Sequence, residues 1–107
     1  INDKSISAGE NSNVKIINSK IINSNIALAS KDQSSINASK LIIINSNIAL
    51  TAYQKKSEFG PASISVDKLN TDNIKILYML ENKSKLIIDG NLMEPNAKSV
   101  YETLYGQ

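Results

Sequence analysis

The hexapeptide NSNIAL occurs twice in this chain, at residues 23–28 and again at residues 45–50, which is a shift of 22 residues. The same shift aligns further residues on both sides of the hexapeptide: Ile6 with Leu28, Glu10 with Asp32, Ser12 with Ser34, Val14 with Ile36, and Ile21 with Ile43. Matches spread over the whole period indicate a structural unit of 22 residues rather than a duplicated local site. Periods of 20–50 residues are typical of solenoids, propellers and other repeat arrays.

The composition indicates which kind of repeat this is. The chain has 17 Ile, 14 Asn and 15 Ser residues, one Phe and no Trp. Ile favours strands because its branched β-carbon packs well on a pleated surface, and Asn favours turns because it tolerates left-handed backbone. Helical solenoids have longer repeats, each with two amphipathic helices. The sequence therefore predicts an all-β protein with many short strands.

A parallel β-solenoid accommodates this unit well. Each turn of 22 residues would contain three short strands joined by three corners, and successive turns would stack at the strand spacing of about 4.8 Å. Residues one period apart then lie above one another. Apolar core columns are predicted for five such pairs: Ile26 with Ile48, Leu28 with Leu50, Val14 with Ile36, Ile16 with Ala38, and Ile21 with Ile43. Hydrogen-bonded asparagine ladders are predicted for Asn23 with Asn45 and for Asn25 with Asn47.

The third turn departs from the period. Ile64 and Val66 match Ile36 and Ala38 at a shift of 28, so six additional residues lie within residues 52–62. Insertions in a solenoid emerge as loops from one face, often the binding face.

Beyond residue 66 the pattern fades. Residues 73–82 are expected to form a strand, residues 84–94 a hairpin with its turn at Asp89-Gly90, and residues 94–105 a short helix that covers the last turn. The predicted organisation is a single domain, with about three β-helix turns in residues 3–69 and a C-terminal cap in residues 70–107.

Charge and residue usage argue against several classes of protein. The net charge is +2, all basic residues are Lys, and they are scattered among ten acidic residues, so a nucleic-acid interface is not expected. There is neither Cys nor His, which removes disulfides, thiolate metal sites and the commonest general base. The longest fully apolar run, residues 41–44, is far shorter than the ~20 residues of a membrane span. Because the chain opens at Ile1, we expect either a removed leader or a segment of a longer protein.

Three segments resemble a known superfamily: DKSISAGENSNVKI (residues 3–16), SKDQSSINAS (residues 30–39) and AYQKKSEFGPA (residues 52–62). They are similar to the closing turns of bacterial right-handed parallel β-helix proteins of the pectate-lyase-like superfamily. These include β-helices attached to large secreted or surface proteins with spore-coat-H-like modules. The resemblance covers about residues 3–66, and the closing VYETLY is similar to the usual C-terminal end. The resemblance implies a right-handed parallel β-helix fold and further turns upstream. It assigns no catalytic residues, because this scaffold supports both enzymes and adhesins.

Candidate site residues cluster near the insertion. We predict a substrate-binding set for an acidic polysaccharide that has a charged group and an aromatic group. The charged group is Lys31, Asp32, Lys55 and Lys56, and the aromatic group is Tyr53 and Phe59. Stacked carboxylates of Glu10, Asp32 and Glu58 are the candidate ligands of a Ca²⁺ ion, the only cofactor considered. Alternatively, these charges are solvated corner residues, and Tyr53 and Phe59 anchor the loop to the solenoid wall.

The resulting functional hypothesis is structural. We expect a non-catalytic β-helix segment of a larger secreted or cell-surface bacterial protein that binds or acts on polysaccharide. The alternatives are part of a polysaccharide-lyase site and a protein–protein adhesion module. Expected partners are an acidic polysaccharide and upstream turns of the parent protein, with self-association through the open edge near residues 6–8.

Overall fold

A computed structural model describes residues 2–54 and 60–96, with side chains from Ile6 onwards. These residues form one six-stranded sheet in the order β1 to β6, and they include no helix. The strands are β1 (Asn2–Ala8), β2 (Asn13–Lys31), β3 (Ser35–Tyr53), β4 (Ser63–Leu80), β5 (Lys85–Ile88) and β6 (Asn91–Leu92). The prediction of an all-β protein is therefore confirmed for this part of the chain. Among the same residues there is no helix long and apolar enough to cross a membrane.

The strands from β1 to β5 pair in parallel, each with the next along the chain. Ile26 of β2 lies beside Ile48 of β3, a register shift of 22 residues, and the same shift relates β1 to β2. Between β3 and β4 the shift is 28, with Ile36 beside Ile64. Both predicted shifts are confirmed. The shift returns to 22 between β4 and β5, where Ser63 lies beside Lys85, so the period persists beyond the point where it fades in the sequence.

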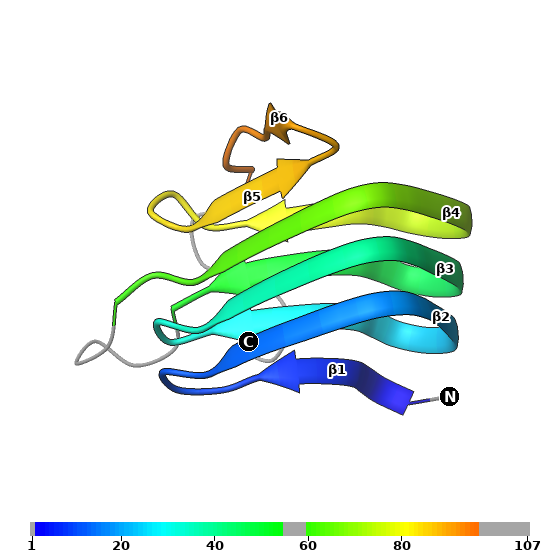
Figure 1. Ribbon diagram of the computed structural model, residues 1–107, viewed down its shortest axis with the longest axis horizontal. Helices are drawn as coiled ribbons and strands as arrows, with labels where there is room; N and C mark the ends of the chain where they lie inside the picture. Colours follow the sequence, from blue (N-terminus) through cyan, green and yellow to red (C-terminus); the bar gives the residue numbers. More distant parts are fainter. Residues whose placement is uncertain (1, 55–59, 97–107) are drawn as a thin grey trace.

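The long strands are bent rather than straight. In Figure 1, β2, β3 and β4 each run outward, turn and run back, and the three ribbons follow one another closely. Each has two residues in left-handed backbone, and these positions are stacked: Asn18, Lys40 and Lys68 at the first bend, and Asn23, Asn45 and Asn73 at the second. The bends divide β3 into a first leg (residues 35–39), a second leg (residues 41–44) and a third leg (residues 46–53); β2 and β4 have equivalent legs.

The left-handed residues also keep the core apolar. Side chains of an ordinary strand alternate between its two faces with a period of two. In β3, Ile36 and Ala38 are buried before the first bend and Leu41 and Ile43 are buried after it, so the spacing across Lys40 is three. The single left-handed residue thus shifts the alternation by one position, and apolar side chains of the first and second legs enter the same core.

The repeated hexapeptide lies at the second bend and in the third leg. Asn45 Nδ2 donates a hydrogen bond to Asn23 Oδ1 at 3.1 Å, and Asn47 Nδ2 donates to Asn25 Oδ1 at 2.8 Å. Asn73 Nδ2 extends the first ladder by donating to Asn45 Oδ1 at 2.7 Å. The predicted asparagine ladders and the predicted Ile and Leu columns are confirmed, and Asn73 is a ladder member that the sequence comparison missed.

The last strands cover part of the β4 edge. β5 pairs with the first leg of β4, and β6 folds back on β5 as an antiparallel hairpin with Asp89 and Gly90 in its turn, as predicted. Asn96 covers the third leg, because its side chain accepts from Leu80 N at 2.8 Å and donates to Tyr78 O at 2.9 Å. Of the helix predicted for residues 94–105, residues 94–96 are not helical and the remainder lies outside the described residues. β4 runs continuously across the predicted boundary between residues 69 and 70.

Candidate functional site

The corner that the sequence singled out is formed where β2 ends. Asp32 has left-handed backbone and donates its N–H to Tyr53 O at 3.2 Å, while its carbonyl oxygen accepts from Asn11 N at 3.0 Å. Lys31 is half-buried and lies beside Tyr53 in the parallel register. The 22-residue shift therefore brings Lys31, Asp32 and Tyr53 together, and it places the exposed Glu10 one residue from Asn11 at the same corner.

Burial distinguishes the members of this predicted set. Asp32 and Tyr53 are each only 1% exposed, so both side chains lie within the wall of the molecule. Lys55, Lys56, Glu58 and Phe59 lie outside the described residues, and the binding and Ca²⁺ roles of the set stay predictions. Within residues 2–54 and 60–96, no group of three His, Cys, Asp or Glu side chains is arranged to hold a metal ion.

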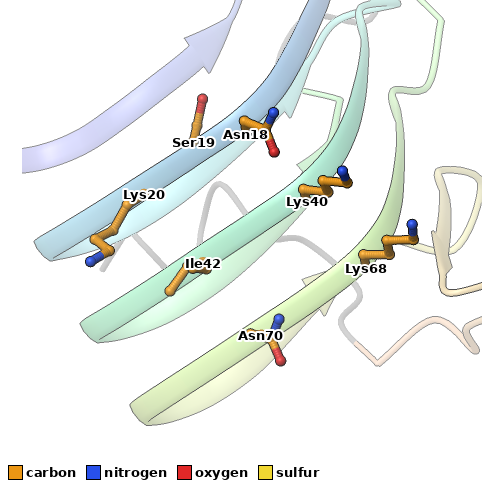
Figure 2. Close-up of a pocket in the computed structure, with 7 residues that line it drawn as sticks. All are labelled: Asn18, Ser19, Lys20, Lys40, Ile42, Lys68 and Asn70. Atoms are coloured by element: carbon orange, nitrogen blue, oxygen red, sulfur yellow. The ribbon is translucent and has the colours of Figure 1, made fainter.

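A different hollow lies on the outer surface at the first bend. It has a volume of about 430 Å³ and is lined by the residues of the first bend and the beginnings of the second legs of three neighbouring strands. We call it the lysine groove, and its lining residues are Asn18, Ser19 and Lys20 of β2, Lys40 and Ile42 of β3, and Lys68 and Asn70 of β4 (Figure 2).

The parallel register places the three lysines close together. Lys40 and Lys68 occupy the same position on neighbouring strands, between the paired residues on either side of them, and their side chains point the same way in Figure 2. Neighbouring strands are about 4.8 Å apart. Lys20 belongs to the next column, in which Lys20, Ile42 and Asn70 lie side by side on three strands. Lysines from three successive strands thus line the groove, with the Lys20 side chain extending away from those of Lys40 and Lys68 in Figure 2.

The electrostatics of the groove favour an anion. All three lysines are exposed, and none of them makes an ion pair or a side-chain hydrogen bond with the residues that the structure describes. Like charges on neighbouring strands repel one another. Acidic groups lie along β4: Asp67 precedes Lys68, Asp89 Oδ1 accepts the N–H of Lys68, and the exposed Asp72 lies two residues beyond Asn70. A bound anion would relieve the repulsion along the rest of the groove.

The sequence contains part of the signal for this groove. The shift of 28 residues aligns Lys40 with Lys68, but these lysines appear scattered when the chain is read linearly. Lys20 is paired with Ile42 on β3, not with a lysine. That Lys20 lines the groove therefore follows only from the arrangement of the strands in the sheet. The hollow lies at the bend formed by Asn18, Lys40 and Lys68, and this bend could be located only from the backbone angles of the structure.

Comparison with known proteins gives no further assignment. No protein-family model matches the chain, and neither the curated proteins nor the solved structures include a significant match.

Proposed function

We propose that this chain is a segment of a right-handed parallel β-helix, with about three turns, that acts as a non-catalytic binding scaffold for an acidic polysaccharide. Three features support a coiled arrangement: the sequential parallel order of the strands, the recurring shift of 22 residues and the stacked left-handed bends. The similarity of residues 3–66 to pectate-lyase-like β-helices agrees with this arrangement.

The lysine groove carries the functional part of the proposal. Lys20, Lys40 and Lys68 come from three successive strands and line one open hollow of about 430 Å³. An acidic polysaccharide complements such a hollow, since one carboxylate of the polymer can lie between ammonium groups of neighbouring strands. The amide and hydroxyl groups of Asn18 and Asn70 and of Ser19 supply hydrogen-bonding partners for sugar hydroxyls.

A polysaccharide suits the groove better than a nucleic acid does. Proteins that bind single-stranded nucleic acid usually stack bases on aromatic side chains. The described lining of the lysine groove contains amide, hydroxyl and aliphatic groups beside its lysines, with Ile42 as its apolar member. Acidic polysaccharides of this type are mainly polymers of cell walls, capsules and matrices, and a secreted or cell-surface location is part of the proposal.

The test is a binding measurement with a matched charge control. Replacing Lys40 and Lys68 together by Ala removes two exposed charge contacts, and at up to ~0.7 kcal/mol each this weakens binding about tenfold. Lys75→Ala removes the same kind of charge from the third leg of β4 and should leave the affinity unchanged. Isothermal titration calorimetry with polygalacturonate provides the affinities. Equal losses in the double variant and in Lys75→Ala would contradict the proposal.

A further inference from the structure

A second hollow adjoins the lysine groove on the outer face of the first legs. It has a volume of about 380 Å³, and its polar lining consists of Lys15, Asn37, Ser39 and Ser65. We call these four residues the Asn/Ser hollow. Lys15, Asn37 and Ser65 form one column across β2, β3 and β4, and Ser39 directly precedes Lys40 of the lysine groove.

The chemistry of this hollow differs from that of the lysine groove. Three of its four polar side chains are neutral, and amides and hydroxyls donate and accept hydrogen bonds alike. Asn37 is exposed, and Ser39 and Ser65 are half-buried, so their polar groups lie at an accessible surface. A further hollow of about 380 Å³ shares Lys15 and Asn37 and adds the neutral side chains of Asn13 and Val14. Such a surface is suited to the hydroxyl groups of an uncharged sugar.

The two hollows follow one another along β3, one before the first bend and one at it. From Asn37 to Lys40 is three residues, or about 10 Å at roughly 3.3 Å per residue. A ligand that follows β3 therefore meets neutral hydrogen-bonding groups first and lysines next. Building on the proposed polysaccharide function, we infer that the ligand is a mixed polysaccharide, with a uronate unit at the lysine groove and a neutral sugar unit at the Asn/Ser hollow.

The experiment compares two acidic polymers of matched length. Hyaluronan alternates a uronate with a neutral amino sugar, whereas every sugar of polygalacturonate is a uronate. We expect the unaltered protein to bind hyaluronan about fivefold more tightly, a difference equivalent to one neutral hydrogen bond of ~1 kcal/mol. The double variant Asn37→Ala/Ser65→Ala should lose this preference. Asn47→Ala, which alters an exposed Asn of the third leg, should retain it.

The outcomes separate this inference from the function on which it rests. Equal affinity for the two polymers, a preference for polygalacturonate, or a hyaluronan preference that survives in Asn37→Ala/Ser65→Ala would each overturn the mixed-ligand inference. Failure of both polymers to bind, or unchanged binding in Lys40→Ala/Lys68→Ala, would overturn the proposed function as well. Circular dichroism and a thermal melt establish that each variant is folded, and the single variant Asn37→Ala replaces the double variant if Ser65→Ala destabilises the fold.

Discussion

Asn45 lies directly beside Asn23 in the sheet, and its Nδ2 donates a hydrogen bond to Asn23 Oδ1 at 3.1 Å. The two residues are the first members of the two NSNIAL hexapeptides, so the sequence repeat corresponds to one step of a side-chain ladder. Both residues also have left-handed backbone, with φ of 57° for Asn45 and 60° for Asn23. Asn suits this position for two reasons: it tolerates positive φ, and its amide donates and accepts along the column.

Replacing Asn45 by Ala should be more destabilising than replacing Asn47 by Ala. Asn45 takes part in two ladder hydrogen bonds and holds a positive φ, whereas Asn47 makes one such bond and is not among the residues with positive φ. At ~1 kcal/mol for each hydrogen bond and about 1 kcal/mol for left-handed Ala, we expect losses of about 3 and 1 kcal/mol. Urea denaturation measures both values. Losses of about 2 and 1 kcal/mol would show that backbone conformation at the bend contributes little, and equal losses would contradict the predicted order.

Leu41 and Ile42 test the shift of alternation at the first bend. Leu41 is fully buried and Ile42 is 37% exposed, although they are neighbours in an apolar run. Leu41→Ala leaves a cavity and should lower the free energy of unfolding by 2–5 kcal/mol, of the order seen for buried Leu in other proteins. Ile42→Ala should cost less than about 1 kcal/mol. Thermal and urea unfolding of both variants measures the difference, and a reversed order would contradict the position of the bend.

The pentapeptide SKLII shows how far the sequence predicts this fold. It occurs at residues 39–43 and again at residues 84–88. At the first site its Lys40 lies at a bend with φ of 59°, and at the second its Lys85 is an ordinary strand residue beside Ser63. Identical local residues therefore occupy different positions in the sheet, because the register is set by pairing with the preceding strand rather than by local preference.

The same reasoning separates the predictable part of the candidate site from the rest. The shifts of 22 and 28, the Ile and Leu columns and the asparagine ladders followed from matches distributed along the chain. The lysine groove did not, because Lys rarely adopts the left-handed backbone that Lys40 and Lys68 have. Only this bend points the side chains of Lys40 and Lys68 the same way, beside one hollow that Lys20 also lines (Figure 2).

Asn96 should stabilise the edge of β4 and protect it from aggregation. Its side chain makes hydrogen bonds with Leu80 N and Tyr78 O, and its own N–H donates to Leu80 O at 3.0 Å, so it substitutes for a further strand. Asn96→Ala removes two bonds and should cost about 2 kcal/mol. The newly exposed edge should also promote aggregation. Urea denaturation and light scattering over a range of concentrations measure the two effects.

Asn82→Ala is the control for this change, since Asn82 is an exposed turn residue close to the same strand. It should leave both stability and light scattering near those of the unaltered protein. If the two variants aggregate alike, the Asn96 side chain does not protect the edge.

Salt should weaken polysaccharide binding steeply. The three lysines are exposed, and raising ionic strength from 0.1 to 1 M shortens the Debye length from about 10 to about 3 Å. We expect calorimetric affinity for hyaluronan to fall with added NaCl, and the fall to be smaller in Lys40→Ala/Lys68→Ala. An affinity that does not depend on salt would mean that the lysine groove is not the binding surface.

Residue-resolved protection of lysines tests the central claim most directly. The protein is acetylated at its amines with and without a saturating acidic polysaccharide, and each lysine is then quantified by mass spectrometry. The account predicts protection of Lys20, Lys40 and Lys68, with Lys75 and Lys83 unaffected. Uniform modification of all lysines, or protection confined to Lys31 at the other corner, would contradict it.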